Sequence, residues 1–212
     1  MFEYICPVCG NSLQKSNAEY LCKNNHSYDI SKQGYINLLM SSKSFHGDSK
    51  TMIMARHDFL KKGYYSHLLQ KICHSVSSYA PQGGRILDMG CGEGYYTSEL
   101  PSEFLSVGGI DISKDAISIA AKRKSGALFA VASASKLPVA DNSVDIALSV
   151  FAPFYIDEIK RILKKSGVFM CVYPLEKHLW ELKNAVYETP YENSSIQRDV
   201  EGFSVVEHIE IR

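Results

Sequence analysis

The sequence lacks several features that would have narrowed its function at once. No apolar run approaches the roughly 20 residues that a transmembrane helix needs. The start, Met1-Phe2-Glu3-Tyr4, has neither the basic nor the apolar segment of a secretory signal peptide. The formal net charge is zero, so overall charge gives no case for a nucleic-acid partner. We therefore expect a cytoplasmic protein with no membrane partner.

What is present suits a globular protein. The length of 212 residues fits one medium-sized domain plus a small appendage, and a hydrophobic content of 45% allows a real core. The six cysteines of a cytoplasmic chain are expected to be thiols or metal ligands rather than disulfides. Charge is uneven, because residues 1–65 hold eight Lys or Arg and five Asp or Glu, a balance of +3. Either this is chance, or a polyanion meets the N-terminal part first.

Four potential metal ligands lie close together near the N-terminus. Cys6-Pro7-Val8-Cys9 is followed by Cys22 and His26, with the spacing C-x2-C-x12-C-x3-H. Two ligand pairs on tight turns are typical of tetrahedral structural zinc. A segment of about 30 residues buries too little apolar surface to fold alone, so a metal would stabilise it. We predict a structural zinc module over residues 1–35, with a core separate from the rest of the chain.

The rest of the chain predicts an α/β fold. Residues 36–65 are expected to be a linker and a first helix, with the linker at 36–50 and the helix at 51–62. A second helix is predicted at 66–79. Strands are expected at 85–89, 106–111, 128–132, 144–150, 168–173 and 203–206, and helices at 95–100, 114–124, 155–163 and 178–187. This alternation predicts a doubly wound parallel sheet over residues 66–212.

A glycine-rich loop follows the first strand of that sheet. Asp88 ends the strand, Gly90, Gly92 and Gly94 follow, and Asp111 ends the next strand. The glycines would let backbone N–H groups approach a ligand at a helix N-terminus. A carboxylate at the end of the next strand is where a doubly wound fold binds ribose hydroxyls. We expect all five residues to bind a nucleoside cofactor.

The spacing favours S-adenosylmethionine over NAD. The loop is G-x-G-x-G, whereas the dinucleotide version is G-x-G-x-x-G. Asp88 directly before the loop is a feature of class I (Rossmann-like) methyltransferases, where it helps to hold the methionine end, and it would repel a pyrophosphate. An NAD enzyme and a strand–helix–strand unit without any ligand remain the alternatives.

Together these features resemble the RlmA (RrmA) family. The matching segments are the Cys6/Cys9/Cys22/His26 set, 32–39, Gly47-Asp48, 55–60, 63–65, 88–97, 151–153 and 178–183. The family methylates N1 of a guanine in a hairpin of 23S ribosomal RNA. The resemblance implies zinc and S-adenosylmethionine as cofactors and 23S ribosomal RNA as partner. It also implies that Tyr65, Gly92, Glu93 and His178 contact S-adenosylmethionine, although Tyr65 could simply pack and His178 could bond to backbone.

The resemblance covers only part of the family's sequence pattern. The family continues for several dozen residues past Arg212, so the seventh strand of a class I methyltransferase sheet has no counterpart here. We therefore expect the methyltransferase domain to be incomplete at its C-terminus. An unpaired sheet edge also makes a homodimer possible.

The methylated base should leave its hairpin and enter the pocket. Phe151 and Phe154 follow the fourth predicted strand, and Phe154 is the stronger candidate for stacking on the base. A general base is plausible because guanine N1 carries a proton. Asp48, His57 and Asp58 are candidates only because they lie in matching segments. A small-molecule methyltransferase and a non-catalytic RNA-binding relic are the alternative functions.

Overall fold

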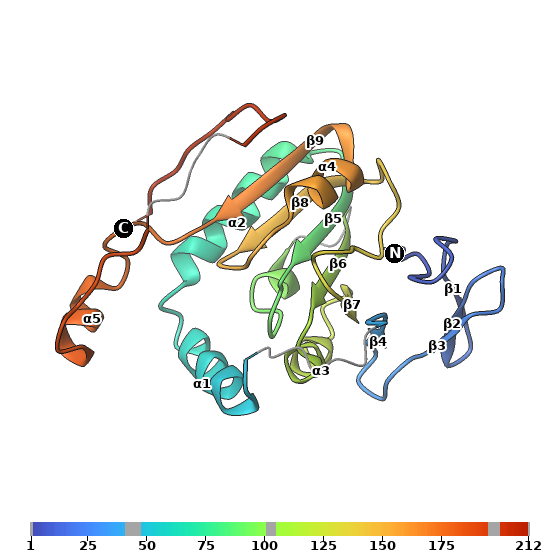
Figure 1. Cartoon of the computed structure of the whole chain (residues 1–212), viewed down its shortest axis with the longest axis horizontal. Coiled ribbons are helices and arrows are strands. Elements are labelled where there is room, and N and C mark those ends of the chain that lie inside the picture. The colour runs from blue at the N-terminus through green and yellow to red at the C-terminus, as the bar shows by residue number, and fades with distance from the viewer. Residues whose placement is uncertain (1, 41–47, 101–104, 195–199, 212) are drawn as a thin grey trace.

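The computed structural model describes residues 2–40, 48–100, 105–194 and 200–211 (Figure 1). Its centre is a six-stranded sheet with the order β4-β7-β6-β5-β8-β9, in which all neighbours are parallel. The strands are β4 (Ile36–Asn37), β5 (Gly84–Met89), β6 (Leu105–Asp111), β7 (Leu128–Val131), β8 (Val144–Val150) and β9 (Leu163–Val172). The chain order reverses between β5 and β8, which is where doubly wound folds bind ligands.

Helices cover both faces of the sheet (Figure 1). They are α1 (Lys50–Lys61), α2 (Ser66–Tyr79), α3 (Lys114–Lys122), α4 (Ile156–Ile162) and α5 (Trp180–Val186), with a short 3-10 helix, η1 (Thr97–Glu99). On one face Val76 of α2 packs in a cluster with Ile86 and Ile146. On the other, Ile159 of α4 packs with Leu87 and Ala147. The alternation of Ile86 and Leu87 along β5 places these neighbours on opposite faces. In the described ranges, no helix has the length and apolar character required to span a membrane.

The N-terminal module contains a small antiparallel sheet of β1 (Gln14–Ser16), β2 (Glu19–Leu21) and β3 (Ser27–Asp29). The prediction of a separate core for this module is wrong. Phe2, Tyr4, Cys6 and Cys22 belong to the same buried cluster as sheet residues such as Leu87.

A gap on the sheet explains this shared core. Residues 132–143, between β7 and β8, contain no helix, so this part of the face needs another cover. The Phe2 ring lies over Gly108 of β6, where a Cβ would meet a ring carbon at 2.6 Å. The Tyr4 hydroxyl donates to the carbonyls of Gly109 and Leu128, at 3.1 and 2.9 Å. The module therefore closes one face of the methyltransferase sheet.

Other elements differ from the sequence predictions at particular points. Ile36, expected in the linker, is fully buried in edge strand β4, a strand too short to produce a periodic pattern. The strand expected at 203–206 is absent, and Val205 and Val206 are 63% and 71% exposed. The helix expected at 95–100 is reduced to η1. Strand β9 begins at Leu163, directly after α4, rather than at 168. Most of the expected linker, residues 41–47, lies outside the described residues.

Candidate functional site

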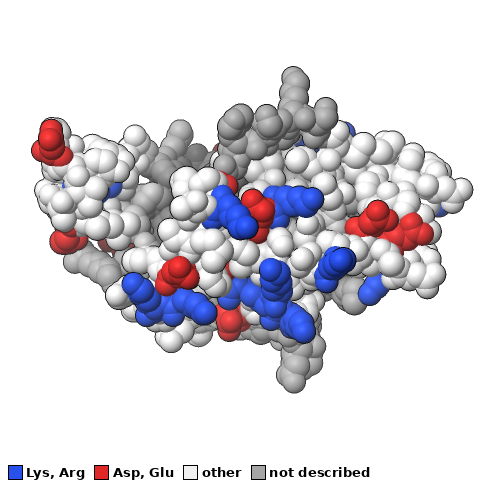
Figure 2. Space-filling view, turned by 90° about the horizontal axis from the view of Figure 1, so that it is seen from below, with Lys and Arg blue, Asp and Glu red and all other residues white. Residues whose placement is uncertain are grey.

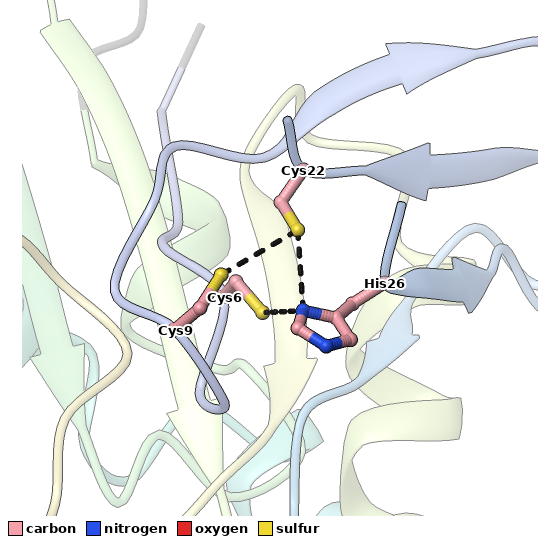
Figure 3. Close-up of side chains that lie close together, drawn as sticks. All are labelled: Cys6, Cys9, Cys22 and His26. Carbon is pink, nitrogen blue, oxygen red and sulfur yellow. Dashed lines mark hydrogen bonds between the residues drawn. The ribbon is translucent and has the colours of Figure 1, made fainter. Parts of the chain in front are cut away.

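The four predicted metal ligands converge in the N-terminal module (Figure 3). All four ligand atoms lie within 4.8 Å of one another. The Cys9 and Cys22 sulfurs are 3.6 Å apart, and His26 Nδ1 lies 3.5 Å from the Cys6 sulfur and 3.4 Å from the Cys22 sulfur. Tetrahedral zinc with ordinary bond lengths separates its ligand atoms by roughly 3.6–3.8 Å. The arrangement therefore fits zinc held by Cys6, Cys9, Cys22 and His26, with all four positions filled by protein.

Neighbouring polar groups support the ligands. The Asn11 side-chain amide donates to the Cys9 sulfur at 3.1 Å, and the Tyr28 hydroxyl lies 3.0 Å from the Cys6 sulfur. Hydrogen bonds from the Asn11 backbone and side chain lower the pKa of Cys9 to about 6. A low pKa favours the thiolate, which is the form that binds metal. These second partners orient the ligands and were not predicted from the sequence.

The glycine loop lies at the carboxyl edge of the sheet, between the ends of β5, β6 and β8. A Cβ on Gly90 would meet Ala152, just after β8, and one on Gly94 would meet Ala120 of α3. All three glycines have a positive φ, but only at Gly92 would an added Cβ enter open space. Of the three, only Gly92 therefore leaves room for a ligand against the backbone.

Asp88 is a buried carboxylate with no cationic partner among the residues that the structure describes. It is 1% exposed, and the Thr97 hydroxyl donates to its Oδ2 at 2.5 Å. Its Oδ1 is buried and has no hydrogen-bond partner in the described part of the chain. Burial raises the pKa of Asp88 to about 7. A ligand with an ammonium group, such as the methionine end of S-adenosylmethionine, would supply the missing donor.

Asp111 has a structural role in addition to its predicted contact with ribose hydroxyls. Its Oδ2 accepts from the backbone N–H of Gly92 at 2.9 Å, and its Oδ1 accepts from Ser113 at 2.8 Å. Burial raises the pKa of Asp111. Each carboxylate oxygen can accept more than one hydrogen bond, so ribose hydroxyls can still bind. Asp111 therefore shapes the glycine loop as well as offering a ligand contact.

Glu93 is held by the protein itself. Its side chain is 1% exposed and pairs with Arg123, which also donates to the Glu93 carbonyl at 2.9 Å. His57 of α1 lies with its Nδ1 2.9 Å from the same carboxylate. This arrangement fixes the loop and attaches α1 to it, rather than directing the Glu93 carboxylate into open space. The sequence singled out Glu93 and His57, but nothing in it indicated their pairing or the part played by Arg123.

Helix α1 covers one side of this loop. A small pocket is lined by Asp48, Ile53 and Arg56 on one side and by Gly92 and Asp111 on the other. Arg56 and Asp48 form an ion pair at 2.7 Å. Asp48 and His57 are thus paired with Arg56 and Glu93, which argues against either acting as the general base. Asp58 is an exposed residue of α1.

Tyr65 and His178, 113 residues apart, lie together at the same edge. The Tyr65 hydroxyl is 3.3 Å from His178 Nε2. Phe151 lies beside both, with its ring centroid 5.5 Å from that of His178. Phe154 lies elsewhere, partly buried in the core and 4.9 Å from Phe169. The structure thus brings Tyr65 and His178 together, while their predicted contact with S-adenosylmethionine stays a prediction. Phe151, and not Phe154, has the exposed aromatic position.

This fold assigns the chain to the class I S-adenosylmethionine-dependent methyltransferases. Residues 87–171 match the family model of the methyltransferase domain, and residues 4–43 match a model described as "RlmA, N-terminal". A solved structure from Methanococcus maripaludis, described provisionally as an S-adenosyl-L-methionine-dependent methyltransferase, shares the fold with a TM-score of 0.52 and 21% identity. It covers 62% of this chain and 66% of that one.

Curated relatives narrow the family further. The chain is 34% identical to the 23S rRNA (guanine(748)-N(1))-methyltransferase of Streptomyces fradiae, over 85% of this chain and 66% of that protein. It is 32% identical to YxjB of Bacillus subtilis, provisionally named a 23S rRNA guanine-N1-methyltransferase, over 94% of this chain and 74% of that protein. The chain belongs to the RlmA family. It spans about two thirds to three quarters of the length of these relatives.

Proposed function

We propose that the chain transfers a methyl group from S-adenosylmethionine to N1 of a guanine in 23S ribosomal RNA. The observation that carries the proposal is the joining of a Cys3His zinc module to a methyltransferase sheet in one buried cluster. Proteins that match this chain over both parts bear names for that reaction. A methyltransferase for metabolites has no evident need for such a module.

The cofactor would bind along the carboxyl edge of the sheet. Asp88 would accept from the ammonium group, Gly92 would give the ligand room, and Asp111 would accept from the ribose. S-adenosylmethionine supplies a methyl group on a sulfonium, so the protein mainly aligns the acceptor nitrogen with it. Tyr65 and His178 would contact the cofactor, and the hydrogen bond between them fixes the positions of both rings.

The guanine would enter beside Phe151. This side chain is 42% exposed and directly follows β8, and its neighbour Ala152 lies against Gly90. A base removed from its hairpin loses stacking energy, and an aromatic surface in the pocket restores part of it. This assignment moves the stacking role from Phe154 to Phe151.

The RNA backbone would lie along a basic face. Figure 2 looks onto the side where α1 and α3 lie, and Lys and Arg side chains gather in the middle of this face with few acidic residues among them. Exposed lysines on these helices include Lys50, Lys61, Lys114 and Lys122. In the module and after α1, Lys15, Lys23, Lys32 and Lys62 are exposed as well. Each phosphate contact adds affinity that falls with salt.

The deciding experiment is nucleoside analysis by mass spectrometry. Purified protein and labelled cofactor are incubated with naked 23S RNA, with assembled large subunits, or with a panel of metabolites. We expect label in 1-methylguanosine from 23S RNA. Label in another base, or only in metabolites, would overturn the proposal. A homodimer stays a prediction, for which light scattering is the measurement.

A further inference from the structure

Five ring-bearing side chains form a continuous row across the carboxyl edge of the sheet. We call them the aromatic ridge: Phe59, Tyr64, Tyr65, Phe151 and His178. The ring centroids of Phe59 lie 5.1 Å from Tyr64 and 6.0 Å from Tyr65. Tyr65 lies 6.1 Å from Phe151, which lies 5.5 Å from His178. Three segments far apart in the sequence, around residues 60, 150 and 178, thus present rings side by side.

Three of the five rings of the ridge are exposed to solvent. Tyr64 is 67% exposed, Phe151 is 42% exposed and Phe59 is 39% exposed. A single exposed aromatic needs no explanation, but a connected row of them is a common sign of a binding surface. The rings therefore do more than fill the core.

Backbone strain points to the same place. Among the described residues other than glycine, six have a positive φ, and the only large apolar ones are Phe151 (+53°) and Leu179 (+57°). For such side chains the left-handed region is unfavourable, because the Cβ comes too close to the following carbonyl oxygen. Phe151 belongs to the ridge, and Leu179 directly follows His178. Strain of this kind collects at ligand-binding sites, where the surroundings hold it in place.

Charge next to the ridge favours a polyanion. Lys61 and Lys62 are exposed beside Tyr64. Asp58, one turn earlier on α1, is the one acidic residue in the segment 58–64, so this segment has a net positive charge. Lysines next to exposed aromatics are the combination with which proteins bind single-stranded nucleic acid, because phosphates meet the cations while bases stack on the rings. Further along the ridge, Phe151 adjoins the glycine loop through its neighbour Ala152.

We propose that the aromatic ridge is a stacking surface for unpaired nucleobases adjacent to the methylated guanine. Phe151 takes the target base, and Phe59 and Tyr64 take its neighbours, while Lys61 and Lys62 pair with the phosphates between them. The substrate class is therefore RNA in an unpaired loop, and a continuous duplex is a poor ligand. This inference rests on the proposed function and deepens it.

The test is a binding measurement that needs no turnover. The probe is a synthetic RNA hairpin whose loop carries a guanine and, next to it, the fluorescent base 2-aminopurine, with a fully paired duplex of the same length for comparison. Wild type should bind the hairpin more tightly than the duplex and should quench the fluorescent base. Tyr64→Ala should weaken hairpin binding roughly 5- to 150-fold and relieve the quenching. Tyr64→Phe, which keeps the ring, should behave as wild type.

Two further variants separate stacking from charge and from folding. Lys61→Gln should flatten the log–log salt dependence of binding by about 0.7 without changing the quenching. Tyr79→Ala removes a partly exposed tyrosine at the far end of α2 and should leave hairpin binding unchanged. Since Tyr64 is mostly exposed, its truncation leaves the buried clusters intact, which thermal unfolding checks.

The outcomes distinguish this inference from the proposed reaction. If both Tyr64→Ala and Phe59→Ala kept wild-type affinity and quenching, the inference that the aromatic ridge stacks nucleobases would be wrong, even if 1-methylguanosine is formed. Equal binding of duplex and hairpin by wild type would also overturn it. Ridge-dependent hairpin binding without any 1-methylguanosine would support the ridge and refute the reaction.

Discussion

Replacing Asp88 by asparagine should stabilise the fold and weaken cofactor binding at the same time. Burial raises the pKa of Asp88 from 3.8 to about 7. Ionising this group in the folded chain therefore costs about 4 kcal/mol more than in the unfolded chain. The asparagine amide avoids this cost but leaves an N–H without an acceptor, which costs about 1–3 kcal/mol. The net gain at pH 8 should be about 1–3 kcal/mol.

The gain should depend on pH with a definite sign. Because the folded pKa is the higher one, the stabilising effect of protonated Asp88 is complete below pH 4 and is lost as the pH rises to 7. The advantage of Asp88→Asn should therefore be largest above pH 7 and should shrink towards pH 4. Urea unfolding at several pH values measures it. Asp29→Asn, at an exposed carboxylate on β3, is the control and should show little effect.

Cofactor binding should change in the opposite direction. An ammonium group bound to ionised Asp88 forms a charge-assisted hydrogen bond worth about 1.5–3 kcal/mol, so Asp88→Asn should weaken binding roughly 10- to 100-fold in calorimetry. Wild-type affinity should rise between pH 6 and 8 as Asp88 ionises, and the variant should lose this dependence. An asparagine variant that is less stable than wild type at pH 8, or that keeps the same pH profile of binding, would refute the reasoning.

Four further predictions concern the zinc module and the glycine loop. Elemental analysis of purified protein should find one zinc per chain, and less than half an equivalent would contradict the four-ligand site. Cys22→Ser should release the metal and lower the melting temperature of the whole chain in one transition, since the module shares the sheet's core, whereas two separate transitions would count against that sharing. Gly108→Val should destabilise the chain by about 1–3 kcal/mol in urea unfolding, because the new side chain would overlap the Phe2 ring, and an unchanged midpoint would argue against this packing. Gly92→Val should abolish cofactor binding and Asp111→Ala should weaken it roughly 10- to 100-fold. Unchanged calorimetric affinity in both would remove the loop from the cofactor site.

The sequence predicted those helices and strands that are determined by residues within the segment itself. The boundaries of α2 (Ser66–Tyr79) and β8 (Val144–Val150) agree with the prediction, because each has a regular apolar pattern that ends at a turn residue or a change of pattern. The zinc ligands were readable for a similar reason, since two short-range pairs fix the geometry of most of the site. The strand expected at 203–206 shows the limit of this reasoning. Its residues have strand propensity, but a strand also needs a partner, which no pattern within the segment can specify.

Contacts between distant segments were not readable from the sequence. The apolar residues Phe2 and Tyr4 precede the zinc ligands and look like part of the module, yet they cover Gly108 and Gly109 more than 100 positions later. The exchange of roles between Phe151 and Phe154 has the same origin, because Phe154 packs on Phe169 of β9, a contact that no pattern near Phe154 specifies. Two glycines in the middle of β6 were the one available signal, since glycine within a strand often marks close approach by another segment.

The two buried carboxylates of the cofactor loop show where the ligand's positive charge belongs. Asp88 and Glu93 are both almost completely buried, five positions apart. Glu93 has a permanent cation in Arg123 and a further partner in His57, so its charge is already compensated within the protein. Within the described ranges, the Thr97 hydroxyl is the only partner of the Asp88 carboxylate, and burial raises its pKa as expected for an uncompensated acid. A cationic ligand group therefore gains most at Asp88 and little at Glu93, and Glu93→Gln should disturb α1 and the loop more than it changes the pH profile of cofactor binding. If Glu93→Gln removed that pH dependence and Asp88→Asn left it intact, the two roles would have to be exchanged.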